Sequence, residues 1–414
     1  MRRVVVTGMG IVSSIGNNCQ EVLASLKNQK SGIDFYQEFA DLDFRSQVCG
    51  NIDINIKEMI PRRVLRFMGD GAAYNYISMV EAIEDAQLTK EDISNLATGL
   101  IVGSGVASGL PIVMMADKVR QQGAKRLDPF NVPKIMSSCN AANLATVFEI
   151  KGYSYTITSA CATSSHCLGN GYQLIQMGHQ DLMFVGGGDE ISWIVAVPFD
   201  AMGALSTKFN DTPDKASRTY DRDRDGFVVS GGGGAIVLEE YEHAKARNAK
   251  IYCEVKGYGA TSDGDDMVRP SGEGAERCMR MALSTVHEPI DYINTHGTST
   301  PAGDIVELEA IKNVFNSSPS INRTGQEKIP YITSTKSLTG HSLGAAGVHE
   351  AIYSILMMEH DFICPSVNIE NIDPKAEGYP IVQTPILNSG LRNVMSNGFG
   401  FGGTNCTLVF GKVD

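Results

Sequence analysis

Short apolar runs and helical patterns alternate along the first half of the chain. Runs that end in glycine or polar residues occur at 96–105 (LATGLIVGSG) and 181–190 (DLMFVGGGDE), as is typical of strands buried on both faces. Residues 153–160 (YSYTITSA) alternate Tyr, Thr and Ile, which favours another strand. Apolar positions recur with helical spacing at 79–87 and 162–177. This alternation predicts a layered α/β fold in which helices cover the sheets.

The second half repeats the pattern. Three predicted strands run into polar or glycine-rich loops, at 291–300 (DYINTHGTST), 331–341 (YITSTKSLTGH) and 394–405 (VMSNGFGFGGTN). Helical patterns follow two of them, at 305–315 and 346–360. In α/β folds the binding and catalytic residues lie on loops at strand ends. We therefore expect these loops to build the functional site.

A faint internal repeat indicates a duplicated fold. The segments VTGMGIVS at 6–13 and VKGYGATS at 255–262 share the pattern V-x-G-x-G-x-x-S, and each lies at the end of a β-rich run. A shared pattern at the start of each half is expected of a duplicated α/β protein. We predict two halves, 1–250 and 251–414, that meet just after a charged helical stretch.

Composition and charge narrow the class of protein. The chain is 43% hydrophobic and 20% charged, as is typical of a folded domain, and its net charge of −12 argues against general nucleic-acid binding. It has no apolar run long enough for a membrane helix, and its first residues lack the features of a signal peptide. Nine cysteines without a C-x-x-C pair predict reduced thiols in the cytoplasm.

One cysteine stands where a predicted strand gives way to a helix. Cys161 follows Ser159 and Ala160 and precedes further small residues, which leave room for another molecule to approach the sulfur. The start of a helix carries partial positive charge, which lowers the pKa of a thiol and favours the thiolate. A buried structural cysteine is the alternative, and Cys167, further along the helix, is expected to be one.

Two histidines stand in loops rather than in helical or charged contexts. His296 is followed by glycine and three hydroxyl residues, and His341 lies between glycines in TKSLTGHSLGAAG. Either histidine alone is more often structural, but a nucleophilic thiol needs such partners. Lys336, five residues before His341, is either a surface charge or a residue that fixes the charge state of a histidine site.

The other motifs favour an anion-binding site over a metal-binding site. The loop GFGFGGTN at 398–405 offers backbone N–H groups for an oxyanion, unless it is a plain tight turn. The stretch DRDRDGF at 221–227 begins like a calcium loop but has Gly232 where glutamate is needed, and no Cys/His spacing indicates zinc.

A basic cluster precedes the helical pattern at 79–87. Arg62 and Arg66 fall on one helical face with Arg63 beside them. Such a cluster is most often a solvated face, and it also suits the docking of an acidic partner.

Five ordered blocks make the chain resemble the β-ketoacyl-acyl-carrier-protein synthases, the condensing enzymes of fatty-acid synthesis. The blocks are TSACATSSHC, the segment 199–234, NTHGTSTPAGD, TKSLTGHSLGAAG and SNGFGFGGTN, and the resemblance covers essentially the whole chain. The segments GGGDEISW and FDAMGALST are more similar to synthase I than to synthase II. The resemblance implies a thiolase-like fold of two duplicated halves with α-β-α-β-α layers.

The resemblance also implies a reaction and its catalytic residues. An acyl group passes from acyl carrier protein to Cys161, malonyl carrier protein loses carbon dioxide, and a Claisen condensation gives 3-oxoacyl carrier protein. His296 and His341 complete the Cys-His-His set of the family, and Lys336 with nearby Glu307 supports it.

Other positions match substrate-contacting residues of the family. The backbone N–H of the gating residue Phe401 joins that of Cys161 in the oxyanion hole. Thr298 and Thr300 match the hydroxyls that contact the phosphopantetheine arm, Met202 falls where the family lines its acyl pocket, and Phe399 is a further substrate-contacting position. The basic patch that docks the acidic carrier protein is matched by Arg62, Arg63 and Arg66.

The family further implies a homodimer that needs neither metal nor diffusible cofactor, because phosphopantetheine carries the acyl groups. The segment 319–331 looks longer than in the family and is predicted to extend a surface loop. A synthase II-type paralogue or a polyketide ketosynthase would share this chemistry. The TKSLTGH block disfavours thiolases and synthase III. A non-catalytic partner subunit is disfavoured because its cysteine is typically replaced.

Overall fold

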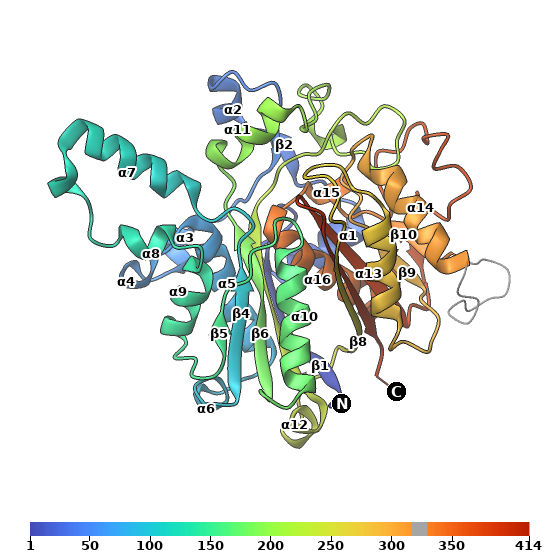
Figure 1. Cartoon of the computed structure of the whole chain (residues 1–414), viewed down its shortest axis with the longest axis horizontal. Coiled ribbons are helices and arrows are strands. Elements are labelled where there is room, and N and C mark those ends of the chain that lie inside the picture. The colour runs from blue at the N-terminus through green and yellow to red at the C-terminus, as the bar shows by residue number, and fades with distance from the viewer. Residues whose placement is uncertain (317–328, 414) are drawn as a thin grey trace.

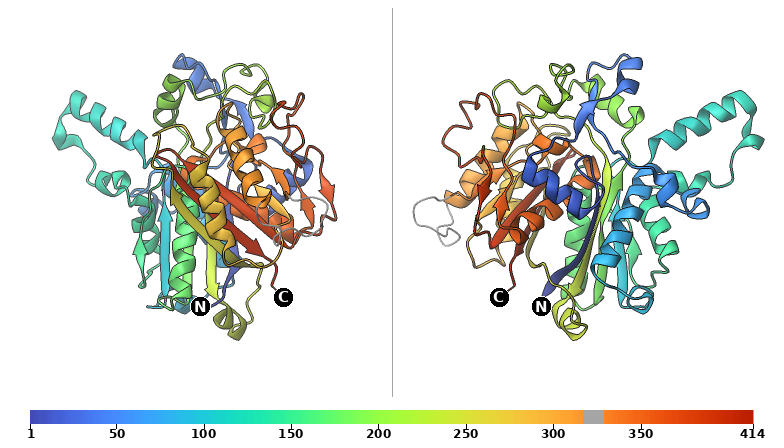
Figure 2. Two further views of the ribbon diagram at one scale, coloured as in Figure 1. Left: turned by 45° about the vertical axis from the view of Figure 1, so that its right-hand side comes forward. Right: turned by 180° about the vertical axis from the view of Figure 1, so that it is seen from behind.

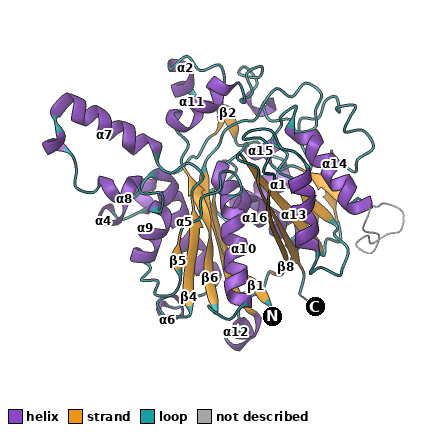
Figure 3. Ribbon diagram, viewed as in Figure 1, coloured by secondary structure: helices purple, strands orange, loops and turns teal. Residues whose placement is uncertain are grey.

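A computed structural model describes residues 1–316 and 329–413. The predicted loop extension at 319–331 therefore lies outside the described residues as far as residue 328. Strands and helices alternate along the described chain, as the sequence predicts (Figure 3).

A mixed sheet of ten strands forms the frame of the molecule. Its first-half strands are β1 (Val4–Val12), β4 (Thr98–Gly103), β5 (Ser154–Tyr155), β6 (Leu182–Asp189) and β7 (Gly232–Glu240). Its second-half strands are β8 (Cys253–Ser262), β9 (Tyr292–Asn294), β10 (Tyr331–Thr333), β13 (Asn393–Gly400) and β14 (Thr404–Gly411). Two small antiparallel pairs stand apart from it: β2 (Ile33–Phe35) with β3 (Val48–Gly50), and β11 (Phe362–Ile363) with β12 (Ile386–Leu387).

The two halves order their strands in the same way. Read outward from the middle of the sheet, the first half runs β1-β7-β6-β4-β5 and the second runs β8-β14-β13-β9-β10. In each half the first two pairings are antiparallel and the last two are parallel. The strands β1 and β8 pair antiparallel with each other and join the halves. They carry the V-x-G-x-G repeat, so the predicted duplication is confirmed; the boundary at residue 250 remains a prediction.

Helices form three layers around the two halves of the sheet. The helices α10 (Thr163–Gln176) and α16 (Ala346–Glu359) contact each other between the halves (Figure 1). One outer face is covered by α5 (Asp70–Asp85) and α9 (Cys139–Val147), and the other by α13 (Glu273–Leu283) and α14 (Gly303–Asn316) (Figure 2). The order of layers is therefore α-β-α-β-α, as the family resemblance implies.

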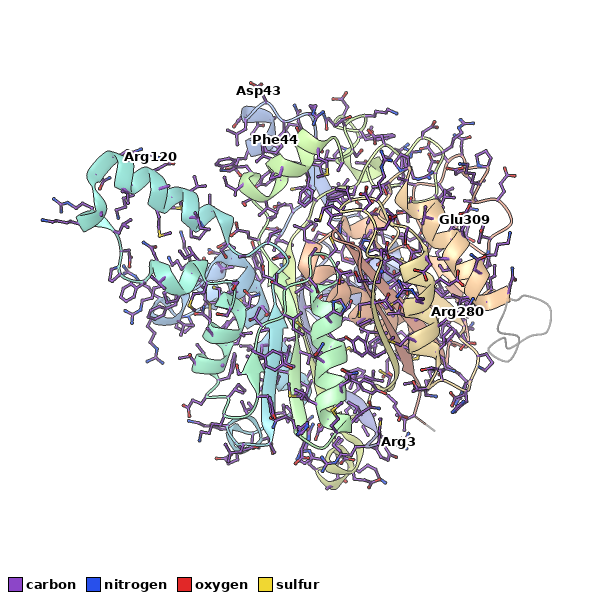
Figure 4. The ribbon with its side chains drawn as sticks, viewed as in Figure 1. Arg3, Asp43, Phe44, Arg120, Arg280 and Glu309 are labelled. Atoms are coloured by element: carbon purple, nitrogen blue, oxygen red, sulfur yellow. The ribbon has the colours of Figure 1, made fainter. Side chains whose placement is uncertain are left out.

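The central layer is the most deeply buried part of the fold. Every residue of α16 except its last, Glu359, is buried, and the largest hydrophobic cluster joins α10 and α16 to strands of both halves. A helix that is apolar on all sides is expected in such a position. The outer helices are instead amphipathic, with charged residues such as Arg280 of α13 and Glu309 of α14 on their outer sides (Figure 4).

The remaining helices are short or peripheral. They are α1 (Cys19–Asn28), α2 (Gln37–Asp41), α3 (Ile56–Met59), α4 (Arg62–Leu65), α6 (Lys90–Ile93), α7 (Gly109–Gln122), α8 (Asn131–Ile135), α11 (Trp193–Met202), α12 (Tyr241–Ala246) and α15 (Lys336–Thr339). Of these, α7 projects from the body as an arm, which carries Arg120 (Figures 1 and 4).

Candidate active site

A cavity of about 410 Å³ opens among loops from both halves of the chain. Nine of the residues singled out from the sequence line it: Cys161, Met202, His296, Thr298, Thr300, Glu307, His341, Phe399 and Phe401. The fold thus gathers residues that are up to 240 positions apart in the chain around one space. Lys336 lies behind this lining, and the three arginines of the basic cluster lie outside it.

The turn before α10 presents Cys161 to the cavity. Ala160 has a positive φ of 47°, a conformation that costs free energy for a residue with a side chain and occurs mostly at functional sites. The backbone N–H groups of Cys161 and Phe401 both interact with the thiol. Gly400 allows this close approach, because a Cβ there would stand 3.1 Å from the Cys161 nitrogen. Two backbone donors therefore converge where an oxyanion would form.

The protonation state of the thiol differs from the sequence-based expectation. Burial raises the pKa of Cys161 to about 12, although Lys336 and the two backbone N–H groups act in the opposite direction. This shift favours a protonated thiol over the thiolate that the helix start alone would favour. The partial charge at the start of a helix is too small to offset the removal of water from the sulfur.

The two histidines lie next to each other in the wall of the cavity. His296 follows β9 and His341 follows α15, and their ring centroids are 5.2 Å apart in an edge-to-face arrangement. Burial lowers the pKa of both rings well below the usual value, and the nearby Lys336 charge lowers it further. Both imidazoles are therefore neutral near pH 7. The Nδ1 atom of each ring is buried without a hydrogen-bond partner among the described residues.

Two buried acids support the histidine loops in different ways. Glu307 accepts hydrogen bonds from the backbone N–H groups of His296 and Gly297, both at 2.9 Å, and from the Asn397 side chain at 3.1 Å. It lies near Lys336, as expected, but the ion-pair partner of Lys336 is Glu350 of α16. Sequence reasoning missed Glu350; its place among the largely apolar residues of α16 indicates a buried charge but does not identify Lys336 as its partner.

Replacing Glu350 with glutamine is expected to destabilise the fold by about 3–5 kcal/mol, because it leaves the Lys336 ammonium buried without its counter-ion. Both side chains are nearly inaccessible, with exposed fractions of 2% and 3%. Urea unfolding measures the loss, and Glu359→Gln at the exposed end of the same helix is the matched control. Equal unfolding midpoints for the two variants would contradict this assignment.

A second buried ion pair holds the loop that follows β9. Arg224 lies 3.0 Å from the Asp304 carboxylate and donates to the Thr300 carbonyl at 3.2 Å. The other oxygen of Asp304 accepts the N–H of Ser299, which has a positive φ of 68°. These contacts fix the loop in which the Thr298 and Thr300 hydroxyls lie 3.0 Å apart at the cavity wall. Sequence reasoning did not single out Arg224 or Asp304.

Aromatic rings surround the opening of the cavity. The Phe401 ring is 38% exposed and lies 6.2 Å from the Phe199 ring, whereas Phe399 lies 5.9 Å from His296. Met202, at the end of α11, is half exposed. The Phe401 side chain is therefore not part of the hydrophobic core.

The basic cluster lies on a single exposed turn. Arg62 and Arg63 belong to the four-residue helix α4, and Arg66 caps its end. The Arg66 guanidinium lies over the rings of Phe67 and Phe130, at 4.8 and 4.4 Å from their centroids. All three arginines are exposed.

Within the described chain, no cluster of His, Cys, Asp and Glu could hold a metal ion. The same residues include no helix long and apolar enough to cross a membrane.

Comparison with known families identifies the chain. The model of the β-ketoacyl synthase N-terminal domain matches residues 1–244, and that of the C-terminal domain matches residues 252–370. The chain belongs to the β-ketoacyl synthase family. The resemblance drawn from its motifs is therefore confirmed.

Relatives within the β-ketoacyl synthase family allow a comparison of the chain with synthase 1 and synthase 2. The chain is 59% identical to 3-oxoacyl-(acyl-carrier-protein) synthase 1 of Haemophilus influenzae, over 99% of both chains, and 57% identical to that of Escherichia coli K12, over the full length of both. A synthase 2 from Vibrio cholerae is 36% identical. The higher identity to synthase 1 than to this synthase 2 agrees with the synthase I-like segments GGGDEISW and FDAMGALST.

Solved structures of synthases share the fold. A β-ketoacyl synthase from Burkholderia phymatum superposes with a TM-score of 0.91 at 33% identity, over the full length of both chains. A type II ketosynthase complex with an acyl-carrier protein, bound to a hexaketide, gives a TM-score of 0.88 at 27% identity. The predicted thiolase-like α/β fold is confirmed.

Proposed function

We propose that the chain is an elongating condensing enzyme of the synthase I type, which extends acyl groups carried on acyl carrier protein by two carbons. The observation that carries this proposal is the single cavity that joins a thiol, two converging backbone N–H groups and two neutral histidines. The names of the relatives at 57–59% identity support the same reaction. The polyketide alternative is less well supported, because the type II ketosynthase complex has only 27% identity.

The first step is a thioester exchange at Cys161. The sulfur attacks the acyl thioester carbonyl, the bond to the phosphopantetheine sulfur breaks, and the thiol proton passes to that leaving sulfur. The tetrahedral oxyanion is stabilised by the N–H groups of Cys161 and Phe401, at about 3 kcal/mol per donor. Because burial raises the pKa of Cys161 to about 12, the attacking group enters this step as a thiol, and its proton leaves as the new thioester forms.

The second step forms the new carbon–carbon bond. The malonyl thioester loses carbon dioxide, and His296 and His341 each donate an N–H to the enolate oxygen that develops. The enolate carbon attacks the acyl carbonyl on Cys161, the C–S bond breaks, and one proton from solvent restores the thiol. Burial keeps both histidines neutral, and the charge of Lys336, which pairs with Glu350, adds to this effect, so neither histidine retains an extra proton.

The cavity walls accommodate the rest of the substrate. We assign the Thr298 and Thr300 hydroxyls to hydrogen bonds with the phosphopantetheine amides, and Met202 and Phe399 to the acyl chain. Phe401 is assigned as the gate, because its exposed ring stands at the opening. Every bond change above uses only the Cys161 thiol, the two thioesters and one proton from solvent, so the proposal needs no metal and no diffusible cofactor.

The acidic carrier protein is assigned to the cluster of Arg62, Arg63 and Arg66. Reversing two charges with Arg62→Glu and Arg66→Glu is expected to raise the KM for acyl carrier protein at least about tenfold, because complementary charge is replaced by repulsion. The KM for a free acyl-pantetheine thioester should not change. Steady-state kinetics with both substrates measures this, and Lys245→Glu on α12 is the control. A parallel change for both substrates would contradict carrier docking at this turn.

We also propose that the chain acts as a homodimer in the cytoplasm. Among the described strands, β5 is one of the two edges of the sheet, and the exposed Tyr153 and Tyr155 lie beside it or in it. Exposed Ile112 and Met114 lie on the projecting helix α7. An exposed edge strand beside apolar side chains is suited to pairing with a second copy. All nine cysteines are free thiols, which fits a reducing compartment.

Turnover tests the proposed function as a whole. The purified chain, mixed with acyl- and malonyl-loaded carrier protein, should release carbon dioxide and 3-oxoacyl carrier protein in equal amounts. A folded protein that gives neither product would contradict it.

A further inference from the structure

The two donors of the proposed oxyanion hole come from different halves of the chain. Cys161 precedes α10 in the first half, whereas Phe401 lies between β13 and β14 in the second. Such donors must be held within about 0.5 Å of the productive geometry to stabilise a transition state. Some contact must therefore fix the two segments relative to each other.

Part of that contact is made by backbone. A Cβ at Gly400 would lie 2.9 Å from the Ser159 carbonyl oxygen and 3.1 Å from the Cys161 nitrogen, so the two segments are already in close contact. Ser159 and Cys161 also form an isolated bridge within the nucleophile turn. Ser159 therefore lies in the nucleophile turn, in close contact with Gly400.

A histidine outside the proposed catalytic set, His166, contacts both the nucleophile turn and the glycine-rich loop. His166, in the first turn of α10, has its Nδ1 atom 2.7 Å from the Ser159 hydroxyl. The ring also interacts with the backbone of Asn405, which is paired with Phe399 at the base of the glycine-rich loop. Burial lowers the pKa of His166, so the ring is neutral. At Nδ1 a neutral ring can accept the hydrogen bond that the Ser159 hydroxyl donates, and its Nε2–H can donate to the Asn405 carbonyl.

We propose that His166 is a positioning residue that links the nucleophile turn to the glycine-rich loop and so holds the two donors of the oxyanion hole together. It lies behind the cavity lining and acts through Ser159 and Asn405 rather than on the substrate. This inference rests on the proposed function, because only an acyl-transfer reaction needs the oxyanion hole.

Two reactions of the Cys161 sulfur distinguish a positioning role of His166 from a general structural role. Acyl transfer forms an oxyanion, whereas alkylation by iodoacetamide does not. His166→Ala should slow acyl transfer from an acyl-pantetheine thioester to Cys161 by about 10–100-fold, roughly one tenth of the effect of losing a complete oxyanion donor. Its alkylation rate should stay within about threefold of wild type. Intact-protein mass follows both reactions, and Gln176→Ala on the same helix, which loses a contact with Tyr172, is the matched control.

Ser159→Ala provides a second variant if His166→Ala does not fold. It removes only the hydroxyl that meets His166 and should slow acyl transfer about fivefold while alkylation is unchanged. Equal losses in both reactions, or a wild-type rate of acyl transfer in both variants, would overturn the positioning role. A folded wild-type chain that accepts no acyl group would overturn the proposed function, and this inference with it.

Discussion

His296→Ala is expected to stop decarboxylation of malonyl carrier protein while Cys161 still takes up an acyl group. The first step uses the backbone N–H groups of Cys161 and Phe401, which the substitution does not touch. The second step loses one of two donors to the enolate, in a buried site where such a donor contributes about 10²–10³-fold to the rate. Carbon dioxide release and intact-protein mass measure the two steps separately.

The architecture of the site makes this separation possible. Glu307 holds the backbone N–H of His296, and that bond survives removal of the side chain, so the loop should keep its conformation. His360→Ala, at the exposed end of α16, is the control and should leave both steps unchanged. Equal loss of acylation and decarboxylation in His296→Ala would show that the histidine serves both steps, contrary to our assignment.

Cys161→Ala should have the opposite effect to His296→Ala: it should abolish acyl transfer to the enzyme and retain decarboxylation. Condensation should fall by at least about 10⁴-fold, because no second cysteine among the described residues lines the cavity to hold the acyl chain between the two steps. Release of carbon dioxide from malonyl carrier protein should continue, because His296, His341 and Lys336 are unchanged. Mass spectrometry of the carrier-bound products and carbon dioxide release measure the two outcomes.

The other cysteine of α10 gives a matched control. Cys167 is fully buried in the central hydrophobic cluster, as its sequence context predicts, so Cys167→Ala should retain both reactions. Loss of decarboxylation in Cys161→Ala would mean that the thiol takes part in enolate formation, and our separation of the two steps would be wrong.

The regular elements could be predicted because burial leaves a local pattern in the sequence. The apolar runs at 96–105 and 181–190 correspond to β4 and β6, and the periodic segment 346–360 corresponds to α16. The predicted strand at 153–160 is shorter, since only Ser154–Tyr155 pairs with β4. The residues that follow belong to the turn that presents the nucleophile, where backbone geometry overrides β-propensity.

The electrostatics of the site could not be predicted in the same way. The position of Cys161 at a helix start was visible, but its raised pKa depends on how tightly residues from both halves exclude water. The partner of Lys336 is Glu350, fourteen positions along the chain on a helix of the central layer. Local sequence contains no signal for which of two acids, Glu307 or Glu350, faces the lysine.

The most direct test of the account is the intact mass of the wild-type chain and of Cys161→Ser after mixing with carrier protein that bears a medium-length acyl group. We predict that wild type gains the mass of one acyl group, carried by the peptide that contains Cys161, and that the variant gains none. A folded wild-type chain that gains no mass, or an acyl group found on another residue, would contradict the central claim that Cys161 is the acyl acceptor.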